Sequence, residues 1–258
     1  MQSLGLNNPA NPAKIGFWKR QFQAQANSKQ KTYDWIFGVI LPVICFAFDP
    51  IVFKGGISGP AMFANYKPFA YLLSFACVMG LAARLIFGEK LKWLNGFLAG
   101  LFFLGGVISL GVGIVLFPLS LLGLMILIGA LGFTPLFTAV IYLRNAVRAF
   151  HASKIFLIKN VRLYAFAFGI IFSASLAWTI NSEIKNSLRW IEIGNPQVAY
   201  AESRKLKYLS PLVNFDNLAL FYNRAMIDEK KSEKMQTIAE IYKELTGQDI
   251  EKKVWIDY

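Results

Sequence analysis

The sequence predicts an all-α protein: a polytopic transmembrane helical bundle of about five spans, followed by a small C-terminal helical domain. Two features of composition indicate a membrane protein: 55% of the 258 residues are hydrophobic and 16% are charged. Soluble domains have about 45–50% apolar and about 25% charged residues. The third feature is a series of long apolar runs. Runs of about 20 residues are long enough to cross the hydrocarbon core as helices.

The predicted spans cover residues 35–53, 68–87, 96–117, 119–143 and 163–180, within a bundle of residues 34–181. The third and fourth spans belong to one uncharged stretch, 94–143. As a single helix it would be roughly 75 Å long, far more than a hydrocarbon core about 30 Å thick. It is therefore expected to fold into a hairpin that turns at Pro118, where proline breaks the helix. A buried kink or a re-entrant element is the alternative.

Basic residues are concentrated among the spans. Residues 1–181 contain 15 Lys or Arg and 3 Asp or Glu, whereas residues 182–258 contain 12 of each. With five spans, 13 of the basic residues flank one side of the membrane and 2 the other. Lys and Arg mark the cytoplasmic side, which predicts a cytoplasmic basic tail (1–33) and an extracytoplasmic domain (182–258). A plasma membrane, or inner membrane in a bacterium, is expected. Cations placed between apolar runs argue against nucleic-acid binding.

No catalytic or metal-binding constellation is visible, so neither an enzyme nor a cofactor or metal site is expected. Cys45 and Cys77 lie inside apolar runs and are interpreted as small buried side chains. His151 is the only histidine, and one histidine does not make a zinc site. Motifs of zinc proteases, serine hydrolases and phosphate-binding loops are absent from the sequence.

Some polar residues in or beside the spans are candidates for function, because ionisable groups in lipid are rare and often functional. For Asp49 the simpler interpretation is an interfacial carboxylate that is capped by water or paired with Lys54. For Arg84 it is a side chain that extends to the headgroups. A proline inside the fourth span predicts a kink whose exposed carbonyl neighbouring hydroxyls can satisfy. The candidate functional membrane residues are Asp49, Arg84, Thr134, Pro135 and Thr138.

Small residues spaced four apart predict close helix–helix contact, either within the chain or in a homo-oligomer. These candidate packing residues are Gly105, Ser109 and Gly113 in the third span and Ala165, Gly169, Ser173 and Ala177 in the last. The basic connection before the last span is expected to contact anionic lipid headgroups, with a cytoplasmic protein partner as the alternative. Its candidate contact residues are Arg144, Arg148, Lys154, Lys159 and Arg162.

The C-terminal segment has the periodicity of three short amphipathic helices. Asn195 reads as the N-cap of the first, with proline at its first position. A second helix is expected from Asn214 or Asp216, and a third from Ser232 to Gly247. The aromatic residues of the C-terminal segment suit a protein interface, or burial against one another and the membrane.

The expected function is therefore anchoring or organising of partner proteins through the extracytoplasmic domain, with the lipid bilayer as the other partner. The alternative is a small solute or ion transporter or an oligomeric pore. Carriers commonly show internal repeats and charges at mid-membrane, which are not seen here, but pores can use hydroxyl groups. A continuous cavity lined by Asp49, Thr134 and Thr138 would favour the transporter.

Overall fold

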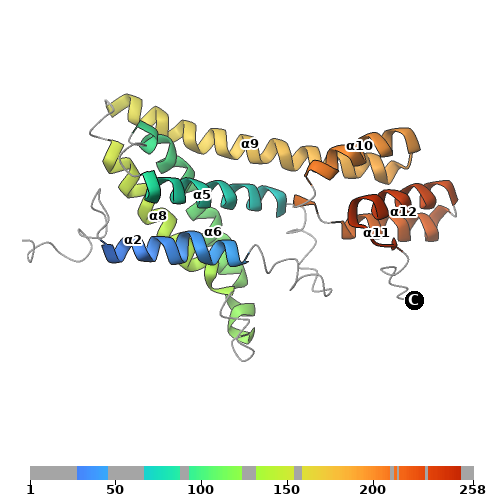
Figure 1. Ribbon diagram of the computed structural model, residues 1–258, viewed down its shortest axis with the longest axis horizontal. Helices are drawn as coiled ribbons and strands as arrows, with labels where there is room; N and C mark the ends of the chain where they lie inside the picture. The colour runs from blue at the N-terminus through green and yellow to red at the C-terminus, as the bar shows by residue number, and fades with distance from the viewer. Residues whose placement is uncertain are drawn as a thin grey trace, which may run out of the picture. The chain divides into compact units, whose positions relative to one another are not determined.

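The computed structural model describes residues 28–45, 67–87, 93–123, 132–153, 159–209, 212–213, 215–229 and 232–250. Within these ranges the chain is helical and has no strand (Figure 1). The described residues fall into two compact units. Those within 1–52 and 74–173 are called the bundle unit, and those within 53–73 and 174–258 the C-terminal unit.

The helices of the bundle unit are α2 (Ser28–Trp35), the π-helix η2 (Ile36–Ile40), most of α5 (Lys67–Phe87), α6 (Asn95–Gly123), α8 (Thr134–Ala152) and the first part of α9 (Lys159–Ile193). The C-terminal unit contains the rest of α9, then α10 (Pro196–Tyr208), α11 (Asp216–Arg224), the π-helix η8 (Ala225–Glu229) and α12 (Ser232–Thr246).

Three helices of the described chain are long and apolar enough to cross a membrane: Pro68–Phe87, Asn95–Pro118 and Asn160–Ile193. They contain the predicted spans 68–87, 96–117 and 163–180, and the last helix extends well beyond its predicted span. Their number is lower than the predicted five. The span 35–53 is described only as far as residue 45, and the span 119–143 is divided between the end of α6 and the start of α8. Helix α8 contains Arg144 and Arg148 and is not among the three helices with a sufficiently apolar window.

The predicted turn at Pro118 is wrong, because α6 continues through this proline to Gly123. Proline removes one backbone donor, but an apolar environment makes several unbonded groups in an open turn still less favourable. The hydroxyl of Ser120 donates to the carbonyl of Leu116 at 2.8 Å. Residues 124–131, which connect α6 to α8, lie outside the described residues.

Three further expectations about the ends of helices and segments need correction. Pro135 does not kink a span, since it lies in the first turn of α8, next to the N-cap Phe133. Its missing N–H has no helical partner to lose there. The basic tail predicted for residues 1–33 is helical from Ser28, where α2 begins. The predicted domain boundary at 182 lies inside α9, which runs on to Ile193.

Helices α6 and α8 form an antiparallel pair held at close range by glycines. A Cβ atom on Gly106 would lie 2.8 Å from the side chain of Leu143, and one on Gly113 would lie 2.6 Å from Leu136. As the residue number rises along α6, the partner's number falls along α8, which is the arrangement of a hairpin. Gly105 faces Cys77 of α5 and Tyr142 of α8. Gly105 and Gly113, predicted as packing residues, therefore lie at contacts within the chain.

Helices α6 and α9 approach still more closely. A Cβ on Gly169 would lie 2.2 Å from the carbonyl oxygen of Phe97, and one on Gly100 would lie 2.2 Å from that of Phe166. Both obstacles are backbone atoms, which cannot rotate away. Glycine at these positions lets two helix backbones touch, as small residues do between helices in lipid.

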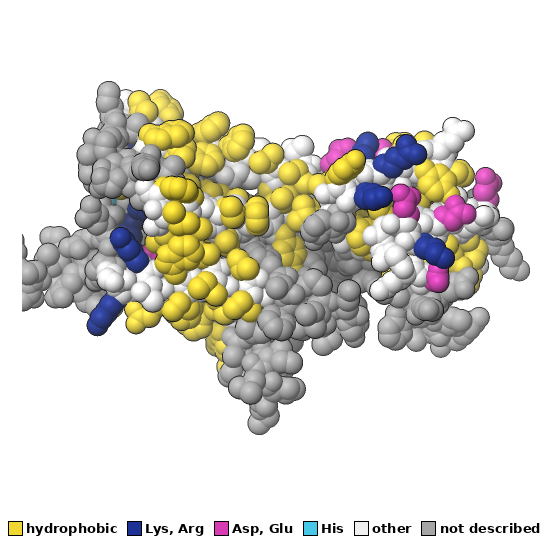
Figure 2. All heavy atoms as spheres, in the orientation of Figure 1, with side chains coloured by type: hydrophobic (Ala, Val, Ile, Leu, Met, Phe, Trp, Pro, Cys, Tyr) yellow, Lys and Arg dark blue, Asp and Glu magenta, His cyan; other side chains and the backbone are white. Residues whose placement is uncertain are grey.

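The C-terminal unit has a hydrophobic core of its own, to which α9, α10, α11 and α12 all contribute. Helix α10 begins at Pro196, and the side chain of Asn195 accepts a hydrogen bond from the N–H of Val198, as expected of an N-cap. Gly194 (φ +83°) and Gly247 (φ +71°) end α9 and α12 in the left-handed region that favours glycine. In Figure 2 hydrophobic side chains dominate the visible surface of the bundle unit, and charges of both signs alternate on the C-terminal unit.

Substituting alanine for Gly169 should destabilise the protein, because its Cβ has no room against the Phe97 carbonyl. Overpacking of this kind costs about 1–3 kcal/mol. Gly111→Ala is the matched control, since its Cβ would meet nothing within 4 Å. Thermal unfolding in mild detergent should show a lower midpoint for Gly169→Ala and an unchanged or slightly higher one for Gly111→Ala. Equal midpoints for the two variants would contradict the close helix contact.

Candidate functional site

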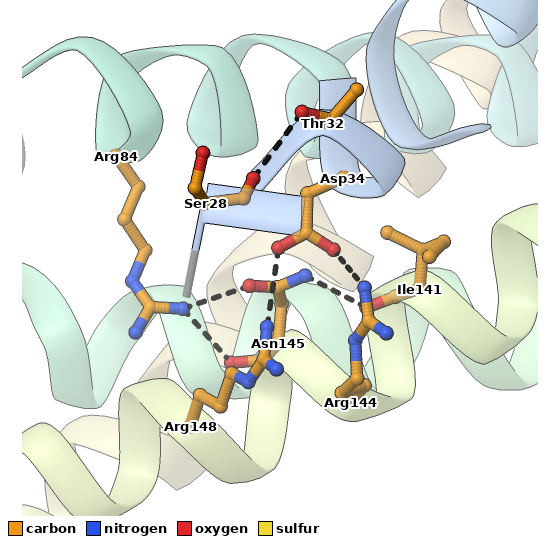
Figure 3. A network of polar contacts seen from close by, with 8 residues as sticks. All are labelled: Ser28, Thr32, Asp34, Arg84, Ile141, Arg144, Asn145 and Arg148. Carbon is orange, nitrogen blue, oxygen red and sulfur yellow. Dashed lines mark hydrogen bonds and ion pairs between the residues drawn. The ribbon is translucent and has the colours of Figure 1, made fainter. Parts of the chain in front are cut away.

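A network of polar side chains lies inside the bundle unit, centred on Asp34 of α2. The Asp34 side chain is 1% exposed. Two arginines of α8 bind it: Arg144 Nη2 contacts Oδ1, and Arg148 Nη1 lies 3.2 Å from Oδ2. Figure 3 shows both guanidinium groups pointing from α8 toward the carboxylate. The three side chains join the N-terminal helix to a helix about 110 residues later in the chain.

Arg84 of α5 joins the same network through Asn145. Its Nη1 lies 3.2 Å from both the backbone oxygen and Oδ1 of Asn145 (Figure 3). The Asn145 amide in turn donates to the carbonyl of Ile141 at 3.0 Å. Arg84 was expected to extend toward lipid headgroups. In the structure its side chain instead binds an acceptor pair on α8, so α2, α5 and α8 meet at one polar centre.

Further polar contacts join η2 to α8, next to the network around Asp34. The hydroxyl of Thr138 donates to the Phe37 carbonyl at 3.0 Å, and that of Tyr142 donates to the Gly38 carbonyl at 3.1 Å. Both carbonyls belong to the π-helical turn, whose wider geometry disturbs the regular hydrogen-bond ladder. Gly38 is also tightly enclosed, since a Cβ there would lie 2.4 Å from Leu81 and 2.8 Å from Ile141.

One face of α8 therefore carries an unbroken line of buried polar residues. Their spacing of four, four, three and three positions places them on the same side of a helix. Each is at most 5% exposed. The five residues are Thr134, Thr138, Tyr142, Asn145 and Arg148. Oγ1 of Thr134 has no hydrogen-bond partner among the described residues.

Among the described residues, the network contains more cationic groups than anionic ones. Asp34 is the only carboxylate among the described residues from 28 to 181, and three guanidinium groups join its network. Burial lowers the pKa of Arg148, which lies beyond the predicted span, to about 10; the charge of Arg144 acts in the same direction and that of Asp34 opposes it. Arg148 therefore remains charged at neutral pH.

The other predicted site residues lie elsewhere or outside the described residues. Arg162 sits over the ring of Phe150, 4.7 Å from its centroid, and Lys159 is the first residue of α9. Ser173 and Ala177 are buried, whereas Ala165 is half-buried. Ser109 is partly exposed on α6. Asp49 and Lys154 fall outside the described residues.

The C-terminal unit presents a second feature, an apolar surface on α11 and η8. Leu220 is 56% exposed and Ile227 74% exposed. Arg224 lies between them on the same face and pairs with Glu192 of α9 at 2.9 Å. Leu218 and Tyr222 point the other way, into the core. This surface, defined by Leu220, Arg224 and Ile227, is called the α11 surface below.

Comparisons with protein-family models, with curated proteins and with solved structures find no match to this chain.

Sequence reasoning missed the centre of the network. Asp34 is one of only three acidic residues in the first 181, but it precedes the first predicted span and is not among the candidate residues. The scarcity of acids was the available signal, because a lone carboxylate among many cations is a natural ion-pair partner. The polar face of α8 could also be predicted from the spacing of its residues, although nothing in the sequence identifies the helix that it contacts.

Asp34→Asn should strongly destabilise the bundle, because it leaves Arg148 buried without its carboxylate. Breaking a buried ion pair costs about 3–5 kcal/mol. Glu192→Gln, which breaks the exposed pair with Arg224, should cost less than about 1 kcal/mol. Thermal unfolding in detergent measures both. The double variant Asp34→Asn/Arg148→Gln should lose less than the sum of the two single losses, and strict additivity would show that the residues do not interact.

Proposed function

We propose that this chain is a multi-pass, non-enzymatic membrane protein that anchors or organises partner proteins through an extracytoplasmic C-terminal unit. The observation that carries the proposal is α9. Its residues Asn160–Ile193 include a window apolar enough to cross a membrane. Its last turns supply Ile184, Leu188 and Ile191 to the core of the C-terminal unit. One helix thus belongs to both an apolar segment and a folded unit, which ties that unit to the bilayer.

The surface of the C-terminal unit supports a role in binding. Large apolar side chains exposed together on a folded unit commonly mark interaction sites. The α11 surface combines two exposed aliphatic residues with an arginine, a residue type enriched at interfaces. The absence of net charge on residues 182–258 leaves specificity to shape and local contacts rather than to bulk attraction.

The proposed orientation follows from the basic residues. Lys29 and Lys31 of α2, Arg84 of α5 and the arginines of α8 belong to the group of 13 cations assigned to one side. The positive-inside tendency places that side in the cytoplasm. An odd number of spans then places the C-terminal unit on the opposite side.

A membrane-impermeant, lysine-reactive crosslinker added to intact cells tests both parts of this proposal. Exposed lysines such as Lys205 and Lys207 should be modified, which reports the side of the membrane. A discrete crosslinked partner should be captured, and Leu220→Glu/Ile227→Glu should reduce its yield about tenfold or more, because two buried apolar contacts would be lost.

Tyr208→Glu provides the matched control, since Tyr208 is 88% exposed on α10, away from the α11 surface. It should leave the yield of the partner unchanged. Protection of Lys205 and Lys207 in intact cells would overturn the orientation. If both variants reduced the yield of the crosslinked partner equally while the lysines were modified normally, the α11 surface would not be the binding site. The proposed orientation would still stand.

Transport is the second candidate function, and the buried polar face of α8 favours it. Polar residues that line up inside a membrane bundle can form an ion or proton path, and π-helical turns such as η2 often occur at functional sites. The hydrogen bonds of Thr138 and Tyr142 to the η2 backbone favour a structural role instead. The anchoring function is therefore preferred.

Reconstitution into liposomes separates the two functions. The anchoring proposal predicts that wild-type protein leaves proton and ion leak at the level of empty liposomes, and that Thr134→Val and Thr138→Val do not change it. Flux above that level which falls with Thr138→Val, but not with the exposed-site variant Val140→Thr, would establish transport along α8.

A further inference from the structure

The π-helical turn η2 lies directly before a proline. The N–H of Leu41 donates to the carbonyl of Ile36, five positions back rather than four. Continued in this π register, the N–H at position 42 would bond Phe37, whereas in an α-helix it would bond Gly38. Position 42 is Pro42, which has no N–H. This proline therefore leaves the Phe37 carbonyl without its donor in the π register, and the Gly38 carbonyl without its donor in the α register.

Helix α8 supplies a hydroxyl to each of these two carbonyls. Thr138 donates to the carbonyl of Phe37 at 3.0 Å, and Tyr142 donates to that of Gly38 at 3.1 Å. Thr138 is 5% exposed and Tyr142 is 0% exposed, which limits competition from water. Neighbouring helices commonly satisfy the backbone groups that a proline leaves free in an apolar environment. The two hydroxyls of α8 are thus matched to Pro42.

The two hydroxyls differ in the backbone register that they support. In an α register the N–H of Leu41 would reach Phe37, and the preceding N–H would take its place at Ile36. The Phe37 carbonyl would then need no hydroxyl. The bond from Tyr142 suits either register, because it serves the carbonyl that the α register deprives. The π register therefore depends on Thr138 in particular.

Burial indicates what the π turn contributes to packing. Gln30, Asp34, Gly38 and Pro42 are buried and lie four positions apart. In a regular α-helix each such step advances about 40° past a full turn, so three steps carry a residue about 120° around the helix. A wider turn corrects part of this drift and keeps the buried face on one side. The start of the face is fixed, because arginines of α8 bind Asp34 (Figure 3).

We propose that η2 is a register switch, which the Thr138 hydroxyl holds in the π state. When that bond breaks, the turn converts to α-helix and rotates the residues after it relative to Asp34. Each later residue then moves into the place of its successor, which is a rotation of about 100° and a shift of about 1.5 Å. The switch does not depend on the anchoring function or on the orientation in the membrane.

The conversion changes the exposure of particular residues after the turn. Leu41 is half-buried and would enter the buried position of Pro42. Val43 is 49% exposed and would move to the position of Ile44, which is 37% exposed. A reporter at residue 41 is therefore expected to lose access to solvent, and one at residue 43 is expected to keep it.

Cysteine labelling of the full-length protein in mild detergent tests the switch. The background is Cys45→Ala, in which the remaining native cysteine, Cys77, is 0% exposed. Leu41→Cys should react with N-ethylmaleimide. Adding Thr138→Val should slow this reaction, because an unbonded buried carbonyl shifts the equilibrium toward the α register about tenfold or more. Val43→Cys should stay reactive with either residue at position 138.

Two further variants serve as controls. Thr134→Val removes another buried hydroxyl one turn earlier on α8, and it should leave the labelling of Leu41→Cys unchanged. Pro42→Ala restores a backbone donor for Phe37 in the π register. In the Pro42→Ala background, Thr138→Val should therefore no longer slow the labelling.

Three outcomes would overturn the switch. The first is unchanged labelling of Leu41→Cys after Thr138→Val, and the second is equal slowing by Thr134→Val. The third is slowing that persists in the Pro42→Ala background, since Thr138 would then not act through the missing donor. If Thr138→Val alone does not fold, Pro42→Ala should restore folding, and a double variant that also fails to fold would contradict the proposal.

Discussion

A carboxylate removed from water needs partners that replace its hydration, and this constraint organises the bundle unit around Asp34. Arg144 and Arg148 reach it from α8, while Arg84 reaches Asn145 on the same helix. These contacts join α2, α5 and α8, which are far apart in sequence, at one position along the bundle unit. A buried ion pair adds little net stability compared with apolar packing, but its geometry discriminates strongly among alternative registers. Here it specifies which residues of α2 and α5 face α8.

Close packing acts together with this polar centre. Glycines of α6 and α9 bring backbones to a distance that no side chain would permit, and such contacts replace the hydrophobic driving force that is weak between helices in lipid. The same bundle leaves large apolar side chains on its outside, among them Ile114, Phe168 and Ile171. An interior with polar bonds and an apolar exterior are the arrangement suited to a bilayer.

The C-terminal unit has a different pattern, with an apolar core of its own and charged side chains on its surface. Its apolar side chains are gathered into a core and its surface pairs are exposed, as for Lys205 with Glu202 at 2.8 Å. The carboxylate of Glu240 accepts hydrogen bonds from Tyr200 and Gln236, which lower its pKa. In the proposed function, the bundle unit contacts lipid and the C-terminal unit contacts protein.

Much of the helical structure could be predicted from local sequence, because apolar runs, caps and glycine stops act over a few residues. The positions of α5 and α10 and the end of α12 at Gly247 follow from such signals. Local rules failed at Pro118, where the surroundings outweigh the preference of proline for a turn, and at Pro135, whose effect depends on where the helix begins. The site around Asp34 was not predictable, because its partners lie about 110 positions away. Which polar groups meet is decided by how the helices pack, and only the tertiary structure contains that information.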